Sequence, residues 1–223
     1  AGRLEPEFEG GVLAAAFQRS GILSRLEVLP NTKKEVCGEM LSPTEELVGL
    51  IMVPGRFGLK VPIELVIRML GHSRMVNFHK IFESIDIFKW HSDNQGNIFI
   101  CARHPLEAKL ICQTRLGGPR LEVEFAKRLL MEIEDSKDRS EDSQIQFAAD
   151  LLRNLGPNGP EKKLYASYYE DIASCLAKLR LERNIENPRI MLQEASLLRE
   201  AVVAIQSVET QVAERLTLLD RAT

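Results

Sequence analysis

The chain has 223 residues, of which 44% are hydrophobic and 27% are charged, and its formal net charge at pH 7 is −3. This composition is ordinary for a soluble globular protein, and the small net charge gives no overall attraction to nucleic acid or to an anionic membrane. No apolar run approaches the ~18 residues of a membrane-spanning helix. The four cysteines, Cys37, Cys101, Cys112 and Cys175, form no C-x-x-C pair, which favours reduced thiols and a cytoplasmic protein.

Residues 1–42 have a weak pattern, and we expect them to form lead-in helices ahead of the better-defined part of the chain. A short helix is expected near residues 11–17, and residues 22–29 supply an apolar stripe. The sequence begins with alanine and opens in mid-pattern, which predicts that the chain is a fragment of a larger protein.

Three helices are predicted in the next part of the chain, ahead of a β-hairpin. Ser42 supplies a capping hydroxyl and Pro43 a first-turn proline for the first of them. The second runs over residues 63–70 and is stopped by a glycine. Ser73 can cap the third, which carries its apolar residues on one helical face.

A β-hairpin is the clearest signal in the sequence. Strand-favouring residues at 88–90 and 98–100 flank a polar turn whose glycine tolerates a positive φ. Pro105 then opens a fourth helix. Three short helices followed by a two-stranded wing is the order of a winged helix-turn-helix domain, which we place at residues 43–116.

Residues 117–223 are predicted to form a helical-repeat domain of the tetratricopeptide or HEAT type. The pattern Ala-x-Leu-Leu-Arg occurs at residues 149–153 and again at 195–199, each time at the start of a helix pair, which suggests the two-helix repeats of an α-solenoid. The helices are expected at residues 120–134, 143–155, 161–183, 188–204 and 206–220. The predicted fold is therefore mainly α, with one β-hairpin.

Motifs that would carry catalysis are absent from the sequence. It has no Walker phosphate loop, no G-x-S-x-G and no H-E-x-x-H. Cys101 and His104 lie close in sequence and His91 lies across the hairpin, but a zinc site needs about four ligands and no fourth is evident. We therefore expect no enzymatic activity, no cofactor and no metal in this chain alone.

A winged helix often binds DNA, so its charged residues are informative. The candidate recognition helix, residues 73–83, carries Arg74, His79 and Lys80 as its donors, and the wing tip at residues 92–97 has no lysine or arginine. Because phosphate contacts dominate DNA affinity, we expect the wing to serve packing instead. A DNA-binding transcription regulator that uses Arg74 and Lys80, with a helical dimerisation or sensor domain, is the alternative.

The segment at residues 99–106 resembles the winged-helix region of STAND-type signalling NTPases, which include NB-ARC proteins and many bacterial antiviral and regulatory ATPases. In that family a short motif, often Met-His-Asp, follows the wing, and its histidine reaches the phosphates of the nucleotide in the NTPase module. His104 matches that histidine, and Arg103 occupies the methionine position, as in the bacterial branch. Pro105 replaces the acid, so the role of the acid has no counterpart here.

The resemblance covers about residues 40–204, and residues 58–65 and 187–200 also resemble segments of bacterial members. It implies the regulatory and sensor portion of an ATPase, in which a winged helix couples nucleotide state to activation and helical repeats bind a protein trigger. It further implies ATP or ADP in a neighbouring NTPase module, a phosphate contact by His104 and Arg103, and a homo-oligomer on activation. His104 could instead cap or pack at the strand-to-helix junction, and both roles stay open.

Overall fold

The computed structural model describes residues 34–36, 39–70, 87–134 and 139–204, to which every structural statement below refers. Within them the fold is mainly helical, with a three-stranded antiparallel sheet and a separate two-stranded one, which confirms the expected helical class. The chain divides into two compact units between Phe147 and Ala148. The predicted domain boundary at residue 117 lies inside the first unit.

The first elements that the structure describes are the two strands of a short hairpin, residues 34–36 and 39–41. They lie at the end of residues 1–42, for which lead-in helices were expected. Residues 1–33 and 37–38 of that stretch lie outside the described residues. The elements of the first unit are β1 (Lys34–Val36), β2 (Glu39–Leu41), α3 (Pro43–Gly55), β3 (Val61–Pro62), α4 (Ile63–Leu70), β4 (Phe88–Ser92), β5 (Ile98–Ala102), α6 (Pro105–Arg115) and α7 (Pro119–Met131). The third helix predicted for the winged helix, residues 73–83, also lies outside the described residues.

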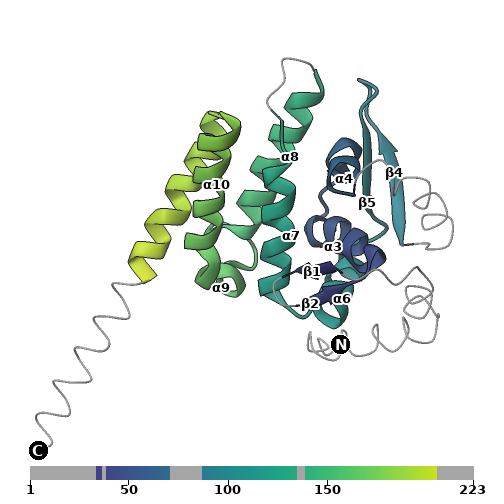
Figure 1. Cartoon of the computed structure of the whole chain (residues 1–223), viewed down its shortest axis with the longest axis horizontal. Helices are drawn as coiled ribbons and strands as arrows, with labels where there is room; N and C mark the ends of the chain where they lie inside the picture. The colour runs from purple at the N-terminus through teal and green to yellow at the C-terminus, as the bar shows by residue number, and fades with distance from the viewer. Residues whose placement is uncertain (1–33, 37–38, 71–86, 135–138, 205–223) are drawn as a thin grey trace, which may run out of the picture. The chain divides into compact units, whose positions relative to one another are not determined.

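Helix α3 is the centre of the first unit. Its start is fixed by a capping box, in which the Ser42 hydroxyl accepts from the Glu45 N–H at 3.3 Å and the Glu45 carboxylate accepts from the Ser42 N–H at 2.8 Å. From Leu47 onward the helix is apolar on all sides, and it is covered by α6, α7 and β5, as Figure 1 shows. Its buried apolar side chains, each 2% exposed or less, are Leu47, Val48, Leu50, Ile51, Met52 and Val53.

The hairpin of β4 and β5 forms where the sequence predicts it, and Gly96 in its turn has a φ of +86°. A third strand that the sequence did not predict, β3, pairs with β5, so that the sheet order is β3-β5-β4. Val61 of β3 lies opposite Ile100 of β5, and both are fully buried. Because β3 is an edge strand, Pro62 can occupy it without removing an interior hydrogen bond of the sheet.

Helix α7 packs directly on α3. A β-carbon on Gly49 of α3 would overlap the ring of Phe125, so the absence of a side chain lets the two helices approach closely. Arg68 of α4 ties the end of α7 by donating from Nε and Nη2 to the Glu132 carbonyl, at 3.0 and 2.7 Å. Its Nη2 also donates to Gln144 at 2.7 Å. These contacts make α7 part of the same core as α3.

The second unit contains the end of α8 (Arg139–Leu155), then α9 (Lys162–Tyr165), the 3₁₀ turn η1 (Ala166–Tyr168), α10 (Tyr169–Arg183) and a helix over residues 188–204. The single helix predicted at 161–183 is wrong, because η1 interrupts it. The break is stabilised by the Tyr169 hydroxyl, which donates to the Lys162 carbonyl at 2.9 Å and so satisfies a backbone group near the break. The helix predicted at 206–220 lies outside the described residues.

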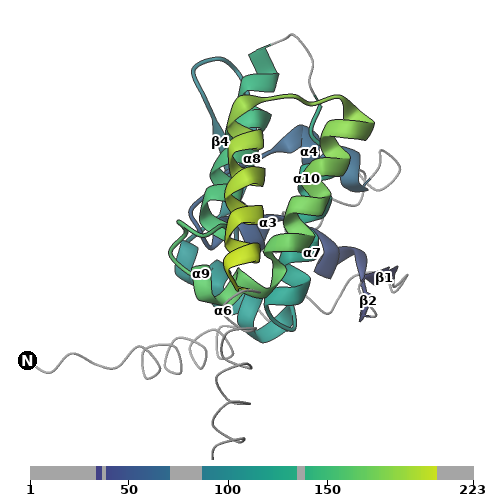
Figure 2. The ribbon, with the colours of Figure 1, turned by 90° about the vertical axis from the view of Figure 1, so that its left-hand side faces the viewer.

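The helix over residues 188–204 lies alongside α10, as Figures 1 and 2 both show. The turn between them begins at Asn184, whose φ of +56° is the left-handed conformation that often ends a helix. Arg180 of α10 donates to Glu194 at 3.1 Å, and Ile190 and Leu197 are 3% and 1% exposed. The two helices therefore form an antiparallel pair with a buried seam.

Candidate functional site

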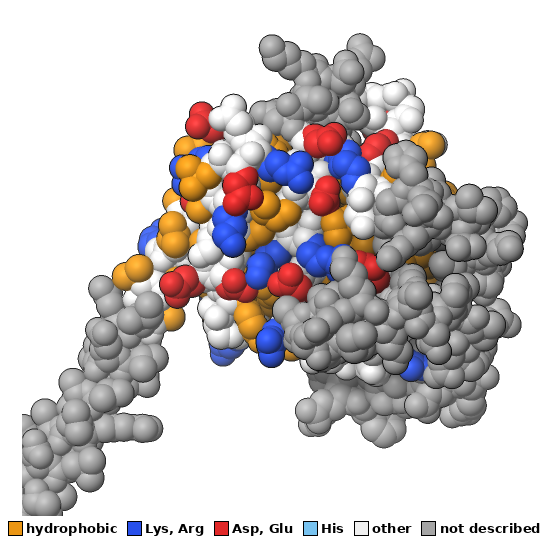
Figure 3. Space-filling model, in the orientation of Figure 1, with side chains coloured by type: hydrophobic (Ala, Val, Ile, Leu, Met, Phe, Trp, Pro, Cys, Tyr) orange, Lys and Arg blue, Asp and Glu red, His pale blue; other side chains and the backbone are white. Residues whose placement is uncertain are grey.

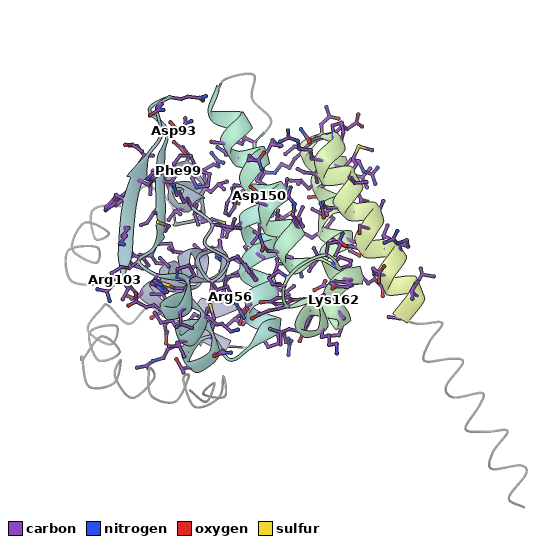
Figure 4. All side chains as sticks on the ribbon, turned by 180° about the vertical axis from the view of Figure 1, so that it is seen from behind. Arg56, Asp93, Phe99, Arg103, Asp150 and Lys162 are labelled. Atoms are coloured by element: carbon purple, nitrogen blue, oxygen red, sulfur yellow. The ribbon has the colours of Figure 1, made fainter. Side chains whose placement is uncertain are left out.

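The candidate site lies at the base of the hairpin, where β5 leads into α6. Figure 4 shows the hairpin with Asp93 at its tip and Arg103 at its base. The Arg103 N–H donates to the Ile87 carbonyl at 2.8 Å, which closes the base of the hairpin, and Ala102 beside it is buried. The junction is therefore held on both strands of the hairpin.

His104 is the N-cap of α6. Its backbone is extended, with φ −145° and ψ 137°, and its Nδ1 accepts from the Leu106 N–H at 3.2 Å. Pro105 at the first helical position has no N–H, so the N–H of Leu106 is the first in the helix that needs a partner. Capping is thus one of the two roles that the sequence left open, and the structure assigns it to His104.

The cap also determines which ring nitrogen can donate. Because Nδ1 of His104 accepts a hydrogen bond, a neutral ring carries its proton on Nε2. The side chain of His104 is exposed, so this nitrogen is available to a ligand. A phosphate contact would use Nε2 and would leave the cap intact, and that contact stays a prediction.

Arg103 already has a carboxylate partner within the chain. Its Nη2 lies 3.0 Å from Oε1 of Glu107 and its Nε donates to Oε2 at 3.3 Å, a two-pronged arrangement that suits a guanidinium. The Glu107 side chain is 3% exposed and that of Arg103 is 36% exposed. Arg103 therefore offsets a buried charge, and any phosphate contact would share its guanidinium. The sequence reading missed Glu107, although an acid four residues after an arginine is a recognisable pairing signal.

The outer face of the hairpin carries the other residues considered as metal ligands. His91 packs near Phe99, with the ring centroids 6.4 Å apart. The Cys101 thiol donates to the Lys89 carbonyl at 3.6 Å, and burial raises its pKa. Among the described residues, no group of three or more histidine, cysteine or acidic side chains could hold a metal ion.

The residues of the DNA-binding alternative, Arg74 and Lys80, lie outside the described residues. The wing tip is described, and it carries a carboxylate. Asp93 accepts from the Gln95 and Asn97 N–H groups at 2.8 and 2.9 Å and from the Asn97 side chain at 2.8 Å. These hydrogen bonds, that from the Asn97 side chain first, lower the pKa of Asp93. An ionised carboxylate at this position repels phosphate.

No protein-family model, curated protein or solved structure matches this chain. Across the part of the chain that the structure describes, the helices lack the combination of length and apolar character that crossing a bilayer requires.

Proposed function

We propose that this chain is the regulatory and sensor portion of a STAND-type ATPase, in which a winged helix reads the nucleotide of a neighbouring NTPase module and the helical repeats bind a protein trigger. The order of elements supports the winged helix. A helix precedes β3, another follows it, and a hairpin then places β5 between β3 and β4. This is the arrangement expected when a wing adds to a short strand between two helices.

The observation that carries the proposal is the geometry of His104. Its Nδ1 is used by the α6 cap, so the ring is held at a fixed place with Nε2 as its donor. An exposed imidazole donor at a helix N-terminus suits a phosphate oxygen, since the positive end of the helix dipole favours an anion there. Arg103 lies beside it, and its guanidinium would be shared between Glu107 and a phosphate.

The position of this junction would allow the nucleotide state to influence how the hairpin lies relative to α6. On one side it continues into β5, whose residue Ile100 is fully buried. On the other side it begins α6, which packs on the central helix α3. A phosphate bound at His104 in one nucleotide state only would stabilise one position of the hairpin relative to α6, and the population of that position would follow the nucleotide.

The proposed trigger-binding role of the second unit is supported by its exposed apolar side chains. Leu164 at α9 is 40% exposed and Leu181 on α10 is 76% exposed. Large apolar side chains in contact with water are frequent at protein interfaces. Exposed apolar side chains on α9 and α10 suit a protein ligand better than a small molecule.

The test uses a polypeptide that carries both an NTPase module and this region. It distinguishes the role of His104 as the N-cap of α6 from its proposed role as a phosphate contact. His104→Ser keeps a good N-cap but removes the imidazole donor, and His104→Ala removes both. We expect both variants to release ADP about tenfold faster, because a hydrogen bond to a charged group contributes ~1.5–3 kcal/mol. Retention of ADP by His104→Ser at the wild-type level would assign His104 to capping alone and would overturn the proposal.

The matched control is His91→Ser. His91 is also an exposed histidine on the hairpin, but it lies on β4, away from the junction with α6. We expect its substitution to leave ADP release unchanged. Binding of this chain to duplex DNA that weakens with salt and is lost on changing Arg74 and Lys80 would favour the transcription regulator instead.

A further inference from the structure

The three-stranded sheet has an outer face whose side chains the proposed function does not use. Lys89 of β4 lies opposite Cys101 of β5. Two residues along the ladder, His91 lies opposite Phe99. Because side chains alternate along a strand, these four share one face of the sheet. Ile100, which points the other way, is fully buried in the core, so the four lie on the side of the sheet that turns away from the core.

Lys60 joins the outer face from the third strand. Val61 of β3 lies opposite Ile100, so the same register places Lys60, one residue earlier, beside Cys101. Burial raises the pKa of the Cys101 thiol, and the charges of Lys60 and Lys89 act in the opposite direction, because both ammonium groups lie near it. Cys101 therefore lies between two lysines that come from the two edge strands of the sheet.

The positive charge of the outer face is not offset. Lys60 and Lys89 are exposed, and among the described residues neither forms an ion pair. None of the three strands contains an aspartate or a glutamate. On the face of the molecule that Figure 3 shows, by contrast, lysine and arginine side chains are interspersed with acidic ones. The outer face therefore favours an anion, although the net charge of the chain is −3.

An aromatic ring lies at the centre of the outer face. Phe99 is on β5, the middle strand of the sheet, and its side chain is only partly buried. The His91 ring lies beside it, with the centroids 6.4 Å apart and the planes inclined by 48°. Figure 4 labels Phe99 on the hairpin, between Asp93 at the tip and Arg103 at the base. Sheets that bind a single nucleic-acid strand use such rings to stack bases, with cations around them for the phosphates.

A single-stranded nucleic acid is the ligand that uses both parts of this face. Its unpaired bases offer flat surfaces to Phe99, and its phosphates suit Lys60 and Lys89. A duplex keeps its bases stacked inside the helix, and its stiff backbone would bring phosphates towards the carboxylate of Asp93 at the wing tip. An acidic peptide would pair with the lysines but would offer no flat partner to Phe99. The combination of charge and ring therefore selects the single strand.

We propose that the outer face of the sheet binds single-stranded nucleic acid, with Lys60 and Lys89 contacting phosphates and Phe99 stacking on a base. The proposal goes beyond nucleotide sensing, since it applies to the 223-residue chain by itself and needs neither ATP nor an NTPase module. It also differs from the transcription-regulator alternative, which uses Arg74 and Lys80 on a duplex. The lysines lie on the strands of the wing and not at its tip.

The test measures the fluorescence anisotropy of a labelled oligothymidylate of about 12 nucleotides during titration with the 223-residue chain at low salt. Lys60→Gln with Lys89→Gln should raise the Kd at least about tenfold. It should also reduce the slope of log Kd against log salt by about 1.4, because each phosphate contact to a single strand contributes ~0.7. Phe99→Leu should raise the Kd at least about fivefold and leave the slope unchanged, because it removes a ring and no charge.

The matched control is Lys162→Gln with Lys163→Gln. Both lysines are exposed in the second unit, so this variant loses the same charge but keeps the outer face of the sheet. We expect its Kd to change by less than about twofold. Circular dichroism and thermal unfolding check that all variants stay folded, which we expect because the lysines are exposed and leucine retains much of the volume of Phe99.

Each other outcome overturns the proposal. A wild-type chain that does not bind the oligothymidylate at low salt would show that the outer face does not take this ligand. Equal weakening by the two lysine variants would show attraction to the whole chain and not to the outer face. Binding that Phe99→Leu leaves unchanged would show that no base stacks there, and displacement of the oligothymidylate by polyglutamate would then assign the face to an acidic protein. A duplex of the same length that binds at least as tightly would show that unpaired bases are not recognised.

Discussion

Arg56 and Glu122 form an ion pair inside the first unit, between the end of α3 and the first turn of α7, and their side chains are only 1% and 2% exposed. Figure 4 labels Arg56 at this position. The Arg56 guanidinium also lies over the ring of Phe57, with 5.4 Å to its centroid. A second ion pair, between Glu46 and Arg128, joins the same two helices nearer the other end of α3. The interface of α3 and α7 is therefore fixed by charge as well as by apolar packing.

Glu122→Leu is expected to destabilise the first unit by about 3–5 kcal/mol, because it leaves the buried Arg56 without its carboxylate partner. The double variant Arg56→Met with Glu122→Leu should recover most of that loss, since it removes both charges. The free energy of unfolding in urea measures both effects. Losses that simply add in the double variant would contradict the role of the pair.

Gly49→Ala is expected to destabilise the protein by about 1–3 kcal/mol, because the added methyl overlaps the ring of Phe125, which is fully buried and cannot move aside. On an open helix surface the same change would stabilise the protein slightly. Thermal unfolding of the variant measures the sign of the effect directly. Adding Phe125→Leu to Gly49→Ala should recover part of the lost stability. If Gly49→Ala stabilised the protein instead, α3 and α7 would have to lie farther apart than the structure places them.

Arg68→Lys should lower stability by about 1–2 kcal/mol, although the charge is kept. A lysine cannot supply the two parallel donors that Arg68 gives to the Glu132 carbonyl. Arg153→Lys is the control, because Arg153 is 62% exposed and pairs only locally with Asp150. The denaturant midpoint of unfolding should therefore be lower for Arg68→Lys than for Arg153→Lys. Equal midpoints would contradict the prediction.

The wing tip should respond to acid in a defined direction. The pKa of Asp93 is lowered from its ordinary 3.8 by the hydrogen bonds from Asn97 and its neighbours. Because the folded pKa lies below the unfolded one, the stabilisation of the turn is present above pH 3.8 and is lost as the pH falls through the lower folded value. The amide resonances of Gln95 and Asn97 should titrate with a midpoint below 3.8, and Asp93→Asn should abolish that titration. A midpoint at 3.8 or above would contradict it.

The parts of the fold that the sequence predicts are those with local causes. Ser42, Pro43 and Glu45 define the start of α3 within four residues, and Gly96 defines the hairpin turn through its positive φ. The strand β3 could not be predicted from the sequence, because it has only two residues and one of them is proline. It is a strand only because it pairs with β5. Such an element has no periodicity of its own.

The contacts that hold α7 on α3 could not be predicted in the same way. Arg56 and Glu122 are separated by 66 residues, and Glu46 and Arg128 by 82, so no local spacing connects them. At the candidate site, the sequence indicates His104 only through the resemblance of residues 99–106 to the motif that follows the wing in STAND-type NTPases. The identity of the nitrogen that caps α6 required the position of the Leu106 N–H.

The dependence of α3 on α7 also has a consequence for biosynthesis. The end of α3 and the start of α7 are separated by the span from Gly55 to Pro119, which a ribosome translates in on the order of several seconds. During that interval the nascent chain carries the apolar residues of α3 without Phe125, the ring that packs against Gly49 in the folded protein. The core of the first unit is therefore complete only once residues 119–131 have been translated, and until then the apolar side chains of α3 lack the cover that α7 gives them.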